Sequence, residues 1–160
     1  MRVAISHEAR PQAMTLLAAA AISIILWFIP FAELLMYPFR IFVTFIHEGG
    51  HALAALLTGN SVHSLSVAMN ASGETYTTQG GQLSQIFVAS AGYIGSMVYG
   101  ALLLILIRKA VAARIVLAGS AALIFALTLI YGLIKPIISL QLGGIPFTLL
   151  AGLSLALGLF

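Results

Sequence analysis

The sequence predicts an all-α membrane protein of about five transmembrane helices, with a small β-hairpin between the second and the third. Three observations lead to this fold class. The 160 residues are 61% hydrophobic and 7% charged, unlike a soluble globular domain. Charged residues are missing over long intervals, such as those between Arg10 and Glu33 and between Glu74 and Arg108. One central stretch alternates between apolar and polar residues, as strands do.

The uncharged intervals predict the spans, because each can hold one helix of roughly 20 residues. We expect them at about residues 12–36, 39–58, 82–107, 114–134 and 140–160. Pro30 would kink the first span, which we interpret as retained because no small-residue cleavage pattern follows it. Gly143, Gly144 and Pro146 would break the chain before or within the last span. We expect residues 1–160 to form a single integral membrane domain.

Residues 61–79 predict the hairpin. Alternation would place one set of side chains on one face, namely His63, Leu65, Val67 and Met69, and Ser64, Ser66 and Ala68 on the other. The turn-forming sequence NASG and the strand-like sequence ETYTT follow. A hairpin in lipid would leave an edge unpaired, so it must lie at the interface or against protein.

The second predicted span carries the motif H-E-x-x-H, with His47, Glu48 and His51. Residues i and i+4 share one helix face, so both imidazoles can reach one zinc ion, and Glu48 can reach a water on that ion. His47 follows Arg40 by about 10 Å of helix, a depth at which a charged side chain costs about 2.5–3.5 kcal/mol. The motif therefore predicts a catalytic zinc site. The alternative is a buried polar cluster that bonds neighbouring helices.

Composition also limits the partners. The net charge of +3 arises from seven basic and four acidic residues, too few for a nucleic-acid surface. The chain has no cysteine, which excludes disulfides and thiolate metal sites. We expect the lipid bilayer and a membrane protein substrate as partners, and no nucleic acid.

Three stretches resemble the site-2 protease family of intramembrane zinc metallopeptidases. The sequence HEGGHALAALLTG, with Gly50 before the second histidine, resembles the family's H-E-x-G-H helix. The hairpin after it resembles the family's re-entrant β-element. The sequence SAGYIGS (Ser90–Ser96) resembles the family's A-G-P-x-x-N stretch, and most closely its short bacterial branch. The resemblance covers about Phe42 to Leu104, and it departs from the wider family where Tyr93 replaces the proline and Ser96 the asparagine.

The resemblance implies a zinc-dependent endopeptidase in a bacterial plasma membrane, crossing it several times. It implies that His47 and His51 bind zinc, that Glu48 is the catalytic base, and that Ser96 helps to position the substrate. The substrate would be a transmembrane helix, unwound locally. Its strand would add to the hairpin edge at 62–70, which includes Val67.

The family also implies a third ligand, an aspartate on a later span, and this sequence contains none. We expect that the C-terminal part of the family pattern is lacking. The alternatives are a ligand from elsewhere, such as His63 or Glu74, or a degenerate site. The alternative function is that of a non-catalytic pseudoprotease or helix-packing scaffold. Gly92, Ser96 and Gly100 recur every four residues, which predicts a close-packing face against the motif helix.

Overall fold

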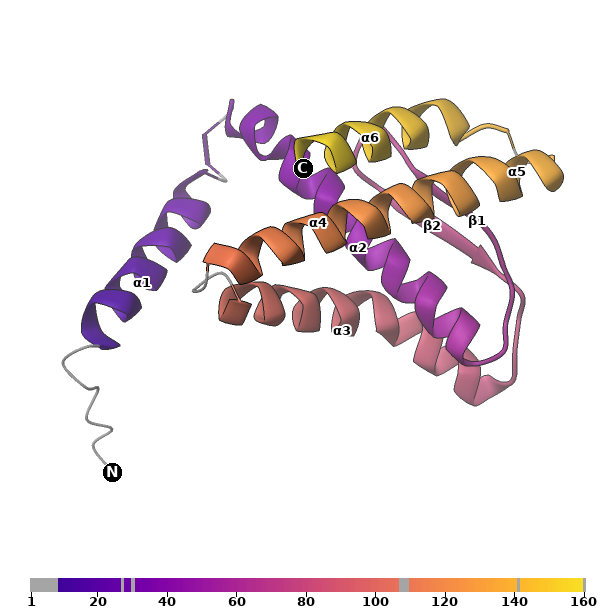
Figure 1. The fold of residues 1–160 in the computed structure, drawn as a ribbon, viewed down its shortest axis with the longest axis horizontal. Helices are drawn as coiled ribbons and strands as arrows, with labels where there is room; N and C mark the ends of the chain where they lie inside the picture. The colour runs from indigo at the N-terminus through magenta and orange to yellow at the C-terminus, as the bar shows by residue number, and fades with distance from the viewer. Residues whose placement is uncertain (1–8, 27, 30, 107–109, 141, 160) are drawn as a thin grey trace. The chain divides into compact units, whose positions relative to one another are not determined.

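The computed structural model describes residues 9–26, 28–29, 31–106, 110–140 and 142–159. Within these residues the chain is mostly helical and holds one two-stranded antiparallel sheet (Figure 1). The elements in chain order are α1 (Ala9–Leu26), α2 (Ala32–Leu57), β1 (Val62–Val67), β2 (Gly73–Thr77), α3 (Gln82–Leu106), α4 (Ala110–Leu129), the π-helix η1 (Ile130–Ile134), α5 (Lys135–Ile138) and α6 (Ile145–Gly158). The predicted kink at Pro30 lies outside the described residues.

Helix α2 differs from the prediction. The sequence led us to expect one span ending near residue 36 and the next beginning at 39, but α2 runs without interruption from Ala32 through Pro38 to Leu57. Proline removes a backbone donor, and apolar helices tolerate this where neighbouring groups satisfy the freed carbonyl. The chain nevertheless divides into two compact units at this point, residues 1–37 and 38–160. The site described below belongs entirely to the second unit.

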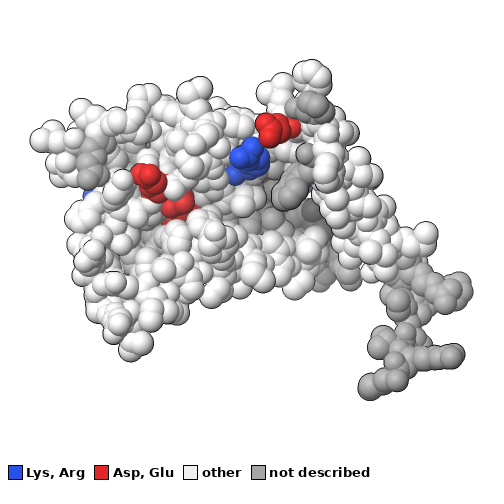
Figure 2. Space-filling view, turned by 180° about the vertical axis from the view of Figure 1, so that it is seen from behind, with Lys and Arg blue, Asp and Glu red and all other residues white. Residues whose placement is uncertain are grey.

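The predicted fold class holds for a mostly helical chain with apolar spans and one small sheet, but five transmembrane helices are not confirmed. Among the described residues, two helical stretches are long and apolar enough to cross a membrane, Gln82–Leu106 and Ala113–Ile138. The apolar helices Pro11–Leu26 and Ile145–Gly158 are shorter, and α2 carries both the histidine motif and three charged residues. Large apolar side chains such as Leu83, Met97 and Leu157 are exposed, and few charged groups interrupt the face shown in Figure 2. This surface suits lipid better than water.

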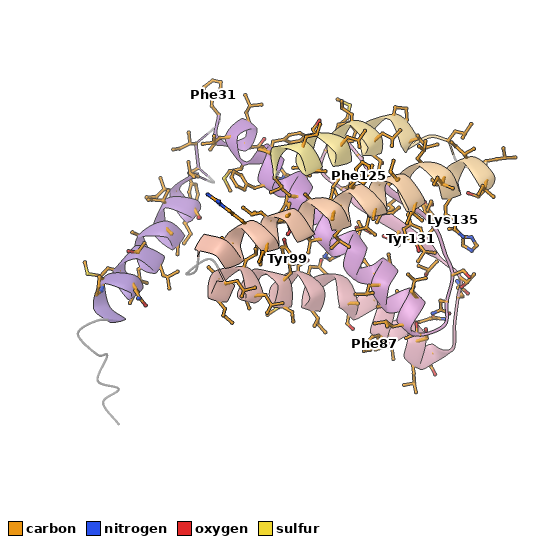
Figure 3. The ribbon with its side chains drawn as sticks, viewed as in Figure 1. Phe31, Phe87, Tyr99, Phe125, Tyr131 and Lys135 are labelled. Atoms are coloured by element: carbon orange, nitrogen blue, oxygen red, sulfur yellow. The ribbon has the colours of Figure 1, made fainter. Side chains whose placement is uncertain are left out.

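The last third of the chain, from α4 onward, is a helical pair. Helix α4 continues through η1 into α5, and α6 returns along α4 (Figure 1). The chain reverses at Leu140, which has a positive φ of 58°, and Pro146 lies in the first turn of α6. The predicted break around Gly143–Pro146 is therefore confirmed. The hydroxyl groups of Tyr99 and Ser120 share a hydrogen bond that joins α3 to α4. Figure 3 labels Tyr99.

The predicted hairpin is confirmed, and local signals at both ends explain it. Gly59, with φ of 78°, ends the helix, and the N–H of Asn60 donates to the carbonyl of Ala55 at 2.8 Å, which is a Schellman closure. At the hairpin tip the N–H of Ser72 donates to the Asn70 side chain at 3.0 Å. The two strands then pair antiparallel, with Leu65 opposite Thr75 and Ser66 opposite Glu74.

The predicted alternation along the first strand is correct only in part. Leu65 and Val67, which were expected on one face, are both buried, and Ser64 of the opposite face is buried as well. His63 is exposed instead of sharing their face, and Met69 is 75% exposed. An irregularity in the register between Val62 and Ser64 accounts for His63, because one extra residue in a strand reverses the side-chain alternation before it.

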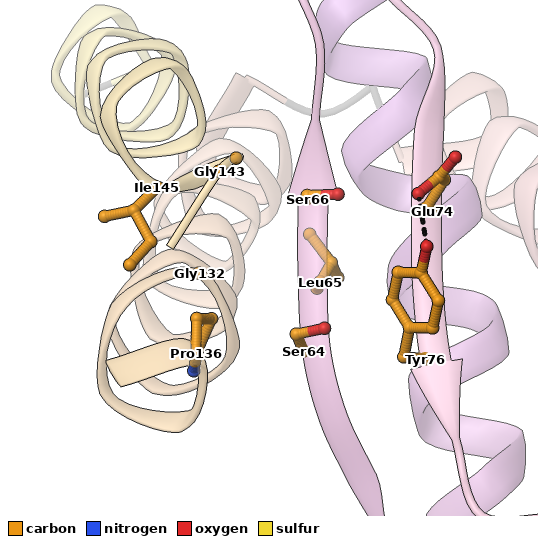
Figure 4. A pocket seen from close by; sticks show the side chains of 10 residues that line it. Ser64, Leu65, Ser66, Glu74, Tyr76, Gly132, Pro136, Gly143 and Ile145 are labelled. Carbon is orange, nitrogen blue, oxygen red and sulfur yellow. Dashed lines mark hydrogen bonds between the residues drawn. The ribbon is translucent and has the colours of Figure 1, made fainter. Parts of the chain in front are cut away.

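The outer edge of β1 is covered by protein. The strand contacts η1, α5 and α6, and Figure 4 shows β1 between β2 and these segments. The N–H of Val67 donates to Thr148 Oγ1 of α6 at 2.9 Å, and the same hydroxyl donates to the carbonyl of Gly144 at 2.8 Å. Thr148 is completely buried, so this contact fixes the hairpin to the helical pair.

We predict that Thr148→Val destabilises the protein by about 1–3 kcal/mol, because the buried N–H of Val67 would lose its acceptor. The matched control is Thr128→Val, because Thr128 is equally buried and, among the described residues, its hydroxyl bonds only the Ile124 carbonyl of its own helix. The free energy of unfolding in a mild detergent measures both. An equal decrease in the free energy of unfolding in the two variants would show that the hydrogen bond from Val67 to Thr148 does not stabilise the protein.

Candidate metal centre

His47 and His51 lie one turn apart on α2 and direct the same ring nitrogen toward each other. Their Nε2 atoms are 3.0 Å apart, and the ring centroids are 4.7 Å apart with an interplanar angle of 81°. Two imidazole ligands of a tetrahedral zinc ion, each about 2.1 Å from it, would have their nitrogens about 3.4 Å apart. The pair therefore needs little rearrangement to share one ion.

Helix α3 fixes the orientation of His51. The Nδ1 atom of His51 lies 2.7 Å from the carbonyl oxygen of Val88. A carbonyl can only accept, so Nδ1 is the donor in this contact, and in the neutral imidazole Nε2 then has the lone pair that a ligand bond requires. Metal-binding histidines usually have such a partner on the other ring nitrogen, because it sets the tautomer and the ring angle.

Gly92 of α3 keeps the space in front of both histidines open. A Cβ added there would collide with the Nε2 atoms of His47 and His51. The helices are also close at Gly50, the residue before His51, where an added Cβ would lie 2.7 Å from the Ala91 carbonyl oxygen. The predicted packing face is confirmed at Gly92, whereas nothing lies within 4 Å of the position that a Cβ on Gly100 would take.

Two further residues of α3 flank this space. The ring of Tyr93 packs edge-to-face on His47, with centroids 4.6 Å apart and an angle of 82°. Tyr93 thus supports a candidate ligand at the position where the wider family pattern has proline. Ser96 lies one turn further on, and its hydroxyl donates to the Gly92 carbonyl at 2.8 Å. The expected role of Ser96 in substrate positioning stays a prediction.

Glu48 is buried under the hairpin, with only 5% of its surface exposed. The hydroxyl of Thr75 on β2 donates to Glu48 Oε2 at 2.6 Å. Gly73 lets the strand come this close, because a Cβ there would lie 2.6 Å from Glu48 Oε1. The hairpin tip is held as well, since Thr44 Oγ1 donates to the Ala71 carbonyl at 2.8 Å. The structure thus places a carboxylate of fixed orientation directly after His47.

The described residues supply two of the protein ligands that a zinc ion needs, His47 and His51. Two imidazole nitrogens converge in front of Gly92, but no group of three or more His, Asp or Glu side chains within the described ranges, Glu48 included, could hold a metal ion. His63 and Glu74 therefore do not join His47 and His51 in this structure. His63 is exposed, and Glu74 accepts a hydrogen bond from Tyr76 on another face of the hairpin.

Sequence reasoning identified the helical motif and missed its supports. The two-residue spacing of Gly73 and Thr75 in the sequence predicts that they share one face of β2. Only the strand pairing shows that this is the face toward α2. Gly92 was noticed as a packing residue without its relation to the histidines. Val88 contributes only a backbone carbonyl, which no side-chain pattern can indicate. Val67, a predicted substrate contact, has a buried side chain and donates its N–H to Thr148.

Comparison with known proteins assigns the family. The model of the family described as Peptidase M50B-like matches residues 15–155. No curated protein and no solved structure matches the chain. The family is one of membrane-embedded peptidases, which agrees with the motif helix and the apolar spans. The match covers nearly the whole chain and confirms the resemblance to site-2 proteases, so this protein belongs to the Peptidase M50B-like family.

Proposed function

We propose that this protein is a zinc-dependent intramembrane endopeptidase that hydrolyses peptide bonds of transmembrane substrates in a bacterial plasma membrane. The observation that supports this most is the convergence of the His47 and His51 Nε2 atoms on the space in front of Gly92. Glu48 follows His47 directly in the chain and is buried, and it would supply the acid–base group that hydrolysis needs.

His47 and His51 would hold the zinc, whose chemistry when bound is to polarise a peptide carbonyl and to make water more acidic. Glu48 would accept the proton of the attacking water and then pass it to the leaving amine. Thr75 keeps the carboxylate oriented by its hydrogen bond to Oε2. Burial under the hairpin excludes bulk water, which strengthens these electrostatic interactions.

The hydrogen-bond pattern of the hairpin shows which backbone groups are free for a substrate. The N–H of Ala68 donates to the Ser72 carbonyl, so these two residues form a hydrogen-bonded pair. Bonded and non-bonded pairs alternate in an antiparallel sheet. Gly73 and Thr75 thus belong to non-bonded pairs and direct their backbone groups away from β1. The outward N–H of Val67, which pairs with Gly73, agrees with this pattern.

Because of this pattern, we propose that the substrate strand adds to the edge of β2 and not to the edge of β1 that the sequence led us to expect. At Val67 the β1 edge is occupied by Thr148, whereas no hydrogen bond to the outward groups of Gly73 and Thr75 occurs within the part of the chain that the structure describes. A strand added to β2 would lie about 4.8 Å beyond it, next to the residue that contacts Glu48. A helical substrate must unwind to bind there, because its own carbonyls and N–H groups are otherwise paired.

The second candidate is a non-catalytic pseudoprotease or helix-packing scaffold. One observation favours it, namely that the described residues offer two zinc ligands and no third. The two functions differ in what they require of Glu48. A protease needs a carboxylate of suitable basicity at this position, whereas a scaffold needs only its shape and hydrogen bonding.

We predict that the purified full-length gene product binds about one zinc per chain, and that Gly92→Ala lowers this content as much as the double variant His47→Ala, His51→Ala does. The added Cβ would collide with both Nε2 atoms. Gly100→Ala is the matched control on the same helix, because open space surrounds that position. Metal analysis in detergent reports the zinc, and circular dichroism reports the helix content. Full zinc content in the Gly92 or the double histidine variant would contradict the assignment.

We predict that Glu48→Gln in the full-length gene product keeps zinc and helix content while hydrolysis of a membrane-embedded peptide falls at least roughly 100-fold. The amide retains an oxygen that can accept from Thr75, so the fold is preserved and only the base is lost. Cleavage rates in detergent micelles measure this. Equal cleavage by both forms, or none by the unmutated form, would favour the scaffold.

We predict that N-methylation of single residues in such a peptide weakens binding with a period of two. A methyl group on an N–H that points toward β2 removes one backbone hydrogen bond, worth about 2–12-fold in affinity. The residues between point the other way and tolerate it. Fluorescence anisotropy with the Glu48→Gln form measures binding without hydrolysis. A loss that is uniform along the peptide would show that the substrate does not add as a strand.

A further inference from the structure

The face of the hairpin that points away from Glu48 carries a separate polar cluster beside a cavity. Four side chains of the two strands line it, namely Ser64, Ser66, Glu74 and Tyr76, and η1, α5 and the start of α6 form the opposite wall (Figure 4). The cavity has a volume of about 330 Å³. Neither the metal centre nor the strand-addition edge uses these side chains.

Glu74 is the charged member of this cluster. It is exposed and accepts a hydrogen bond from the Tyr76 hydroxyl at 2.9 Å. That hydrogen bond, and then the negative charge itself, raise the pKa of Tyr76, so the phenol remains a neutral donor. No lysine or arginine within the described ranges forms an ion pair with Glu74. The carboxylate therefore offers unpaired negative charge next to the open edge of β2.

Strand geometry connects this charge to the substrate. In a strand added to β2, the residue paired with Thr75 would face α2 and Glu48, and the residue paired with Glu74 would face the opposite side. Directly opposed residues have Cβ atoms about 5 Å apart, within reach of a long basic side chain. The residue that meets Glu74 is thus a direct neighbour in sequence of the residue that faces the catalytic carboxylate.

We propose that Glu74 is a specificity-determining residue that selects a lysine or arginine in the substrate, at the position that pairs with it next to the cleavage site. The inference rests on the strand addition of the proposed function. It goes further in that it names the chemical class of one substrate side chain. The expected selectivity is modest, about 1.4–5-fold, as for exposed cross-strand charge pairs.

The test measures binding, so it does not depend on hydrolysis. One synthetic transmembrane peptide is prepared with Lys, Gln or Glu at each successive position near its cleavage site. Affinities are measured in nonionic detergent for the Glu48→Gln protein and for this protein with Glu74→Gln or Glu74→Lys added. Where Glu74 is retained, we expect Lys peptides to bind more tightly than Gln peptides. The added Glu74→Gln change should make these two affinities equal, and the added Glu74→Lys change should make Lys peptides bind more weakly than Glu peptides.

Position and salt provide the controls. The preference for Lys over Gln should appear only at peptide positions where N-methylation is tolerated, because a residue paired with Glu74 directs its N–H away from β2. The preference should also fall as added salt screens the attraction between the lysine and Glu74. Tyr76→Phe keeps the carboxylate and should keep the sign of the preference. An identical peptide ranking in all three proteins, or no peptide binding, would overturn the inference. Neither outcome decides whether the enzyme hydrolyses peptides, which the Glu48→Gln comparison tests independently.

Discussion

The hydrogen bond between His51 Nδ1 and the Val88 carbonyl joins the motif helix to α3, and the geometry of the site depends on it. The bond can form only because the two helices approach closely at Gly50 and Gly92. A larger residue at either position would separate the helices, release the imidazole and fill the space in front of it. Gly50 and Gly92 thus bring α2 and α3 together and leave room for the two imidazoles, and small residues are common where helices meet in apolar surroundings.

The two edges and the two faces of the hairpin contribute in different ways. Its β1 edge is closed by Thr148 and attaches it to the helical pair. One face covers Glu48 and orients its carboxylate through Thr75, and the other carries Glu74 and Tyr76. The β2 edge remains open beside Thr75, which contacts Glu48. A two-stranded sheet is marginal alone, so the anchoring of β1 is what allows β2 to present an edge of fixed geometry.

The sequence predicted what depends on residues close together in the chain. The spacing of His47 and His51, the turn at Asn70 and the break before Pro146 are local, and the structure confirms each. The errors involve tertiary context. Pro38 did not end a helix, and an irregular register turned His63 outward. The contacts of Glu48 with Thr75 and of His51 with Val88 span 27 and 37 residues, and no local pattern reports such pairs.

The hydrogen bond between His51 and the backbone of α3 couples ligand binding at the site to the association of α2 with α3. A ligand that occupies both Nε2 atoms would hold His51 in the rotamer that bonds Val88, and so would favour the association of α2 with α3. By thermodynamic linkage, the two effects are equal in free energy. A force that separates these helices therefore weakens ligand binding by as much as the ligand stabilises their association. The metal affinity of the centre would therefore depend on the spacing of α2 and α3. Membrane tension or a change in bilayer thickness that alters this spacing would change the metal affinity.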